Sequence, residues 1–210
     1  MPLTKRDPEN KEHYVIVGGG PAGLNCAETL RQSGFSGQIT MVTKEKSLPY
    51  DRTLLSKAIA SGDASKWDLR PQEFLSEADI DIKLNSSAFS VKPEENKLIT
   101  TNGDKIIYDK LLIATGSNAW APPCEGIKAN ARLNKVHPLR TKQDMEKIQK
   151  ACEGAKNIVI IGASFIGSEC AASLKMHYKD ATNITIVNGD DVPFKLTLGK
   201  ELGEFYQKEH

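Results

Sequence analysis

Residues 13–23 read HYVIVGGGPAG and carry the clearest fold signal in the chain. The apolar run that opens this stretch is typical of a strand buried in a parallel sheet. A glycine-rich turn follows it, and residues 24–33 then have the apolar spacing of a helix that ends at Gly34. With a further strand at 39–42, this makes a βαβ unit of about 30 residues, the setting in which a glycine turn binds phosphate.

The glycines of this turn have separate roles in such a unit. Gly18 allows the tight turn, Gly20 lets the backbone approach a diphosphate, and Gly23 lets the helix pack closely on the strand. Pro21 and Ala22 belong to the turn, and the N-terminus of the helix that follows would present unpaired N–H groups and the positive end of its dipole to an anion. A tight turn that binds no ligand is the alternative interpretation.

The pattern recurs at residues 158–167, which read IVIIGASFIG. Gly162 and Gly167 keep their places, and Ser164 stands where the middle glycine would be. A hydroxyl there can still donate to a phosphate, although a turn without a ligand is again the alternative. Two such units predict an α/β fold with two Rossmann-like nucleotide-binding modules. The economical pair of ligands is a flavin and a nicotinamide that exchange a hydride.

The end of the second strand of each module is where an acidic residue would bind a ribose hydroxyl. The candidates are Lys44 and Glu45 in the first module, and Asn188, Asp190 and Asp191 in the second. Asn188 can hydrogen-bond a ribose but would neither repel nor strongly attract a 2′-phosphate. NADPH therefore stays open as the coenzyme, and NADH is favoured because no arginine follows this strand closely.

Shorter elements are predicted between and around the two modules. Helices are expected at 54–57, 71–78, 142–152, 168–178 and around 198–207, and strands at 98–100, 106–108, 110–113 and 184–187. Residues 1–12 are polar and are expected to form an arm or linker.

Composition excludes several classes of protein. The chain has 210 residues with a formal net charge of +1, which argues against a nucleic-acid-binding surface that works through bulk charge. No apolar run approaches the roughly 20 residues of a membrane-spanning helix, and the N-terminus resembles neither a signal peptide nor a convincing transit peptide. Cys26, Cys124, Cys152 and Cys170 form no CxxC pair, so no metal site and no dithiol centre is expected.

Four stretches resemble the apoptosis-inducing-factor-like flavoprotein reductases, which include ferredoxin and rubredoxin reductases. They are VIVGGGPAGLNCAETLRQSGFSGQITMVT, LPYDRTLLSKA, IIYDKLLIATGS and IVIIGASFIGSECAASL. The likeness is greatest to the apoptosis-inducing factor 3-like branch, which can carry an N-terminal Rieske iron–sulfur domain. No Rieske cysteine–histidine pairs occur in this chain.

The resemblance implies which coenzyme each module binds, with FAD on the first turn and the nicotinamide nucleotide on the second. The implied FAD contacts are Gly18, Gly20, Pro21, Ala22 and Gly23 on the diphosphate, Lys44 or Glu45 on the ribose, Ala88 at the adenine, and Arg52, Lys57, Thr115, Gly116 and Arg140 toward the flavin. The implied nicotinamide-nucleotide contacts are Gly162, Ser164, Phe165, Ile166, Gly167 and Asn188. Two departures from the family pattern are Thr53, where a proline is usual, and Lys44, which aligns with the ribose acid.

Lys57 and Glu169 are the catalytic pair that the resemblance implies. Relatives place this glutamate near the N5 atom of the flavin, paired with the lysine of the motif. A carboxylate–ammonium pair at that place can orient both rings and respond to the charge of the flavin. The alternatives are a merely solvated acid near a helix N-terminus and an exposed surface lysine.

The resemblance also divides the chain, into an arm at 1–12, an FAD-binding domain at 13–140 and an NAD(P)-binding domain at 141–210. Both domains are expected to be incomplete on their C-terminal side, and exposed sheet edges would then favour self-association. The implied function is an FAD-dependent NAD(P)H oxidoreductase that passes hydride from NAD(P)H to flavin, and electrons on to an acceptor such as an iron–sulfur protein of Rieske or ferredoxin type, a quinone or oxygen. The implied compartment is mitochondrial or cytoplasmic. The alternative is a non-catalytic nucleotide-binding or scaffold module descended from such a reductase.

Overall fold

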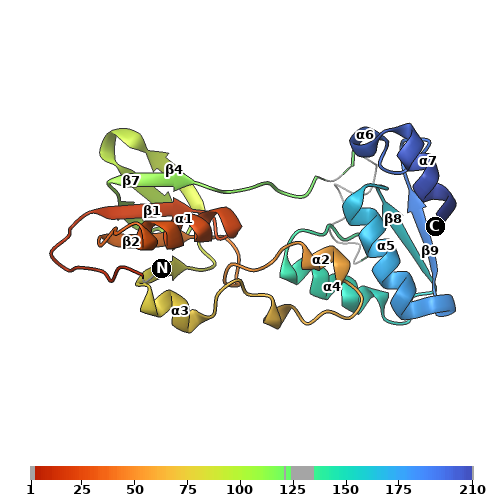
Figure 1. Cartoon of the computed structure of the whole chain (residues 1–210), viewed down its shortest axis with the longest axis horizontal. Coiled ribbons are helices and arrows are strands. Elements are labelled where there is room, and N and C mark those ends of the chain that lie inside the picture. The colour runs from red at the N-terminus through yellow and green to blue at the C-terminus, as the bar shows by residue number, and fades with distance from the viewer. Residues whose placement is uncertain (1–2, 121, 124–134, 210) are drawn as a thin grey trace. The chain divides into compact units, whose positions relative to one another are not determined.

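The computed structural model describes residues 3–120, 122–123 and 135–209, which form two compact units (Figure 1). Unit 1 comprises Met1–Asp51 and Ser65–Asn118, and unit 2 comprises Arg52–Ala64 and Ala119–His210. Cys124 lies outside the described residues. Each unit contains two parallel strands joined through a helix, as the two glycine-turn patterns predict.

Unit 1 has a parallel sheet of four strands in the order β3-β2-β1-β7. Its strands are β1 (His13–Val17), β2 (Gln38–Val42), β3 (Ile80–Lys83) and β7 (Lys110–Ile113). Val15 pairs with Thr40 on one side and with Leu111 on the other, so β1 lies inside the sheet. Its β-branched residues suit that position because they pack well on both faces of a pleated sheet.

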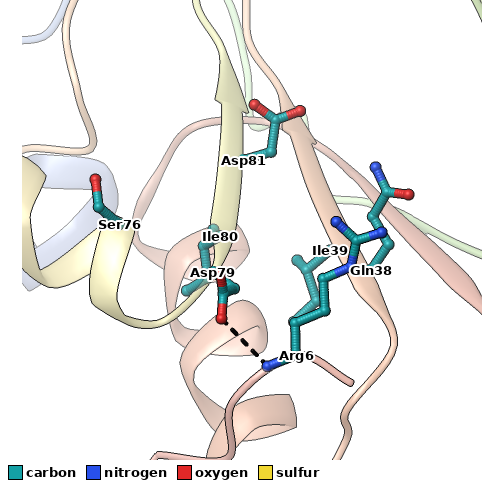
Figure 2. Close-up of a pocket in the computed structure, with 7 residues that line it drawn as sticks. All are labelled: Arg6, Gln38, Ile39, Ser76, Asp79, Ile80 and Asp81. Atoms are coloured by element: carbon teal, nitrogen blue, oxygen red, sulfur yellow. Dashed lines mark hydrogen bonds between the residues drawn. The ribbon is translucent and has the colours of Figure 1, made fainter. Parts of the chain in front are cut away.

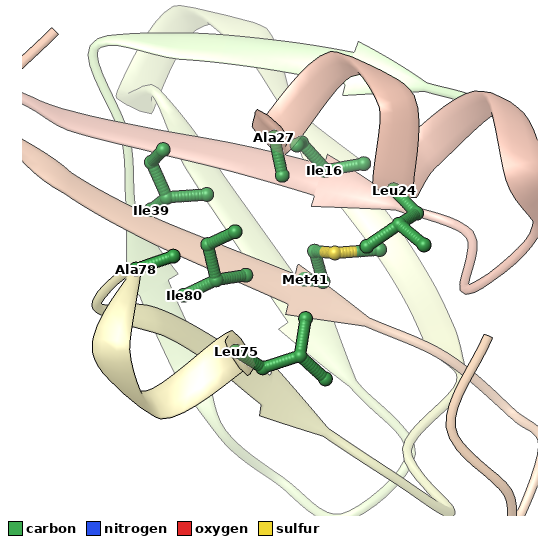
Figure 3. Packing of buried hydrophobic residues seen from close by; sticks show 8 residues of the cluster. All are labelled: Ile16, Leu24, Ala27, Ile39, Met41, Leu75, Ala78 and Ile80. Atoms are coloured by element: carbon green, nitrogen blue, oxygen red, sulfur yellow. The ribbon is translucent and has the colours of Figure 1, made fainter. Parts of the chain in front are cut away.

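Helices α1 (Pro21–Gln32) and α3 (Gln72–Glu77) pack against one face of this sheet through a buried apolar cluster (Figure 3). The cluster joins strand and helix residues: Ile16, Leu24, Ala27, Ile39, Met41, Leu75, Ala78 and Ile80. The two-residue period of a strand turns Val15 and Val17 to the opposite face. There they pack with residues of an antiparallel sheet, β4 (Ala88–Lys92), β5 (Lys97–Thr100) and β6 (Lys105–Ile107).

A buried arginine ties the C-terminal end of α1 to the starts of β2 and β3. Arg31 is completely buried, and its guanidinium donates to the backbone oxygens of Phe35, Gly37, Ala78 and Asp79 at 2.7–2.9 Å. Burial lowers the pKa of Arg31, with the Asp79 carboxylate opposing that shift. These carbonyl groups satisfy the guanidinium inside the protein, which makes its burial tolerable.

Unit 2 is built on a parallel pair of strands, β8 (Asn157–Ile161) and β9 (Asn183–Val187), joined through α5 (Phe165–Tyr178). Its other helices are α2 (Leu54–Lys57), α4 (Lys142–Cys152), α6 (Lys195–Leu198) and α7 (Lys200–Glu209). Short 3₁₀ turns of the chain are Ala64–Lys66, Pro93–Glu95 and Lys179–Ala181. Val159 and Ile161 of β8 are 61% and 58% exposed, in contrast to the buried residues of β1.

The sequence pattern predicted most of these elements within three residues. Both glycine-turn helices begin earlier than expected, at Pro21 and Phe165, because the residues of the turn itself form the first helical turn. Strand β3 was not predicted, although Ile80 and Ile82 alternate with Asp81 and Lys83 as in other short strands. The α/β fold with two Rossmann-like modules is confirmed. No helix in the described part of the chain is long and apolar enough to cross a bilayer.

One segment lies in a different unit from the one its sequence position suggests. Residues 52–64 are flanked by unit 1 on both sides, yet α2 within them packs against α5 of unit 2. The predicted boundary at residue 140 divides the chain by the coenzyme that each domain would bind, whereas units 1 and 2 are divided by compactness. The boundary at residue 140 stays a prediction.

Candidate nucleotide-binding site

The first glycine turn is held by backbone contacts from both neighbouring strands of β1. The N–H of Gly18 donates to the backbone oxygen of Val42 at 2.9 Å. Gly18 has a φ of +127°, and a Cβ at this position would lie 2.1 Å from the backbone oxygen of Ala114. Residue 18 must therefore be glycine for two independent reasons, its dihedral angle and the closeness of β7.

The start of helix α1 is open to a ligand. Gly20 is the N-cap residue, and apart from Gly20 and its two chain neighbours no heavy atom of the described residues lies within 4 Å of the position that its Cβ would occupy. Gly23 is the opposite case, since its Cβ would lie 2.2 Å from the backbone oxygen of Gly18. In the described structure no side chain caps this helix and its first turn carries no acid, so its N–H groups can bind an anion.

The second glycine turn repeats this geometry in unit 2. The N–H of Gly162 donates to the backbone oxygen of Val187 at 2.8 Å, and Gly162 has a φ of +108°. A Cβ on Gly167 would lie 1.9 Å from the backbone oxygen of Gly162. Ser164 is the N-cap residue of α5, but within the described residues its hydroxyl makes no capping hydrogen bond. That hydroxyl is therefore available to a phosphate.

The candidate ribose-binding residues already have partners inside the protein. The ammonium group of Lys44 donates to the side-chain oxygen of Asn118 at 2.5 Å, and the Glu45 carboxylate accepts from the Tyr50 hydroxyl at 2.8 Å. In unit 2 the side-chain oxygen of Asn188 accepts from the N–H of Ala163 at 3.3 Å, inside the glycine turn. Asn188 thus supports the turn, and any contact with a ribose would come in addition to that role.

The remaining predicted FAD contacts are distributed over both units. Thr115 and Gly116 are exposed and follow β7 directly, close in sequence to the Ala114 oxygen that lies against Gly18. Ala88 is exposed at the first position of β4. Arg52 and Arg140 both lie in unit 2, where the guanidinium of Arg52 donates to the backbone oxygen of Arg140. Phe165 and Ile166, which are predicted contacts of the nicotinamide nucleotide, are exposed at the start of α5.

Lys57 and Glu169 form an ion pair inside unit 2. The Lys57 ammonium lies 3.2 Å from Oε1 of Glu169, and the hydroxyl of Ser56 donates to Oε2 at 2.5 Å. The Ser56 hydrogen bond, assisted by Lys57, lowers the pKa of Glu169. The carboxylate is therefore ionised at neutral pH and is held on both of its oxygen atoms.

Two polar partners of predicted site residues were not found by sequence reasoning, Ser56 and Asn118. Ser56 stands within the quoted motif, but no spacing rule indicates that its hydroxyl meets a glutamate more than a hundred residues away. Asn118 follows the turn at Thr115 and Gly116 and carries no periodic signal of its own. Both contacts depend on tertiary packing.

A pocket of about 210 Å³ lies in unit 1, and Figure 2 shows the side chains that line it. It is lined by Arg6, Gln38, Ile39, Ser76, Asp79, Ile80 and Asp81. Gln38 and Ile80 are the first residues of β2 and β3, so the pocket lies at the amino ends of these strands. Nucleotides bind at the carboxyl ends of strands in such sheets, which places this pocket outside the candidate site.

Comparison with known proteins agrees with this geometry. A family model described as pyridine nucleotide-disulphide oxidoreductase matches residues 12–210. The chain is 36% identical to apoptosis-inducing factor 3 from Homo sapiens over 93% of this chain and 31% of that protein. It is 32% identical to rhodocoxin reductase from Rhodococcus erythropolis over 93% of this chain and 45% of that protein.

A solved structure gives the same result for the fold. The covalent putidaredoxin reductase–putidaredoxin complex contains a chain that matches with a TM-score of 0.86 and 27% identity, over 96% of this chain and 48% of that one. This chain therefore spans less than half the length of each of these three relatives. Because the family model covers almost every residue, the chain belongs to the pyridine nucleotide-disulphide oxidoreductase family.

Proposed function

We propose that this chain supplies the two nucleotide-binding turns of an FAD-dependent NAD(P)H oxidoreductase. The observation that carries the proposal is the recurrence, in both units, of a strand, a glycine at positive φ and a helix whose N-terminus no side chain of the described residues caps. One such turn fits one diphosphate, and two turns fit the two coenzymes of a flavin-dependent reductase.

The residues present fit these coenzymes. The open space beside Gly20 and the bare N-terminus of α1 would receive the FAD diphosphate, and the start of α5 at Ser164 would receive that of the nicotinamide nucleotide. When bound, the flavin supplies the capacity to accept a hydride and to release single electrons. Lys57 and Glu169 would orient the rings and hold a fixed charge pattern beside them.

The proposed electron acceptor is an iron–sulfur protein of ferredoxin or Rieske type. Two relatives of this chain are named as ferredoxin–NAD(+) reductases of dioxygenase systems, and they are 33% and 30% identical to it. The same names favour NADH as the donor. The proposed compartment remains mitochondrial or cytoplasmic. Self-association is proposed through β8 and β9, whose apolar residues Val159, Ile161, Ile186 and Val187 are exposed.

The test is reconstitution of the purified chain with FAD, followed by anaerobic addition of NADH. We expect a bound flavin spectrum that NADH bleaches, and gel filtration of the same sample reports any self-association. Gly20→Glu is the matched control, because a Cβ has open space at this position and the carboxylate would repel the diphosphate. That variant should fold and lose FAD.

Three outcomes would contradict the proposal. A folded chain that retains no FAD supports the alternative of a non-catalytic nucleotide-binding or scaffold module. A chain that retains FAD in equal amounts with and without Gly20→Glu binds it elsewhere than at the first glycine turn. Retained flavin that neither NADH nor NADPH bleaches excludes hydride transfer by this chain alone.

A further inference from the structure

Two adjacent residues of α2 hold the two oxygen atoms of the Glu169 carboxylate. The Ser56 hydroxyl is 2.5 Å from Oε2, and the Lys57 ammonium is 3.2 Å from Oε1. An ionised carboxylate only accepts hydrogen bonds, so the Ser56 hydroxyl must be the donor. Contacts to both oxygens fix the rotation of the carboxylate plane, which a contact to one oxygen would leave free.

The two contacts differ in their exposure to water. Ser56 is 5% exposed as a residue, whereas the side chain of Lys57 is 52% exposed and that of Glu169 is 30% exposed. Water competes with the exposed ammonium group and weakens its attraction for the carboxylate. The hydroxyl of Ser56 is shielded from water, and a hydrogen bond to a charged acceptor in that setting is among the stronger ones in proteins.

A second contact keeps α2 and its following residues aligned with α5. The N–H of Ala60 lies 3.5 Å from the hydroxyl of Ser173, which is four residues after Glu169 and therefore on the same face of the helix. This contact resembles the one made by Ser56 in joining the same two segments. It differs in that it does not touch the carboxylate, which makes Ser173 a matched control.

We infer that Ser56 is a positioning residue that holds the Glu169 carboxylate more strongly than the exposed Lys57 does. The inference rests on the proposed function for its catalytic meaning. Its structural part concerns only residues of unit 2.

The direction of the Glu169 pKa agrees with this assignment. The Ser56 hydrogen bond is the largest cause of the lowered pKa, and Lys57 contributes less. A titratable group that interacts with Glu169 is the Cys170 thiol on α5, whose pKa burial raises to about 12, so it is neutral when Glu169 titrates. Because the folded pKa is lowered, the stabilisation is present above the ordinary pKa of a glutamate and is lost as pH falls through the folded value.

The first test is an NMR titration of the Glu169 carboxyl carbon in the full chain without coenzyme, with Glu169→Gln identifying the signal. Ser56→Ala should raise the pKa of Glu169 more than Lys57→Met does. Ser173→Ala should leave that pKa unchanged, and Ser56→Thr should restore much of the shift because it keeps the hydroxyl. An unchanged pKa in Ser56→Ala, or a larger rise in Lys57→Met, would overturn the inference.

The second test measures reduction of the FAD-loaded chain by NADH under anaerobic conditions. Ser56→Ala should slow flavin reduction about tenfold, with the NADH concentration at half-maximal rate little changed, as expected for a lost hydrogen bond to a charged group. Ser173→Ala should leave the rate unchanged. If the parent chain is not reduced at all, the proposed function fails, while the titration still decides whether Ser56 holds Glu169.

Discussion

The two glycine turns share one local geometry but lie in different surroundings. Gly18 and Gly162 both have positive φ, and a Cβ on Gly23 or on Gly167 would collide with the first glycine of its own turn. In unit 1 a third strand adds a second constraint, because the oxygen of Ala114 lies against Gly18. In unit 2 a Cβ on Gly162 would have no heavy atom of the described residues within 4 Å, apart from those of Gly162 and its chain neighbours.

This comparison distinguishes the glycines that the turn itself requires from those that a neighbouring strand of the sheet requires. The last glycine of each turn approaches the first glycine of the same turn. This contact is therefore present even in unit 2, whose strands are partly exposed. The requirement for glycine at the first position is strengthened only where a neighbouring strand is present. Three pairs of substitutions, each pair with one change in each unit, test this contrast.

The largest expected effect is the difference between Gly18→Ala and Gly162→Ala. Forcing alanine into a positive φ costs about 1–2 kcal/mol at either position. Gly18→Ala adds a clash with a backbone oxygen, so its total loss should reach about 3–4 kcal/mol. Hydrogen exchange in β1 and in β8 during urea unfolding measures the loss of unfolding free energy in each unit separately. Equal losses would show that β7 does not constrain the first turn.

The next comparison uses the eleventh residue of each glycine-turn helix, Arg31 in α1 and Lys175 in α5. Arg31 is completely buried on four carbonyl groups, whereas the Lys175 side chain is 58% exposed and bonds Lys179 and Asp180 at the helix end. Arg31→Met removes the hydrogen-bond donor of these backbone oxygens and should destabilise unit 1 by about 3 kcal/mol.

Lys175→Met should change the stability of unit 2 by less than about 0.5 kcal/mol, since surface substitutions of this kind have small effects. Hydrogen exchange in β2 and in β9 reports the two units in each variant. Comparable losses in the two variants would mean that burial of Arg31 does not set unit 1 apart.

The smallest expected effect on stability comes from exchanging the middle residues of the turns, Gly20→Ser and Ser164→Gly. Both positions have extended backbone with negative φ, so each change should alter the unfolding free energy by less than about 1 kcal/mol. Gly20→Ser should nevertheless weaken FAD binding about tenfold, because the side chain occupies the approach of the diphosphate. A spectroscopic FAD titration measures this. Unchanged affinity would show that the diphosphate does not approach Gly20.

The sequence predicted the parts of the fold that depend on neighbouring residues. Both strand–turn–helix units, the hairpin of β5 and β6, and helix α4 follow from periodicity and turn residues within a few positions. It did not predict that α2 packs on α5, or that Ser56 reaches Glu169. Those contacts join segments far apart in the chain, and no local pattern encodes them. The pairing of Lys57 with Glu169 was accessible only through resemblance to a family.

The placement of residues 52–64 in unit 2 has a consequence for inheritance. The backbone passes from one unit to the other after residues 51, 64 and 118, so the sequence of neither unit is contiguous. A single crossover at any position within the coding sequence would therefore divide at least one of the two units. New reductases assembled by shuffling would have to exchange the α2 segment together with the remainder of its unit, or inherit both units as one block.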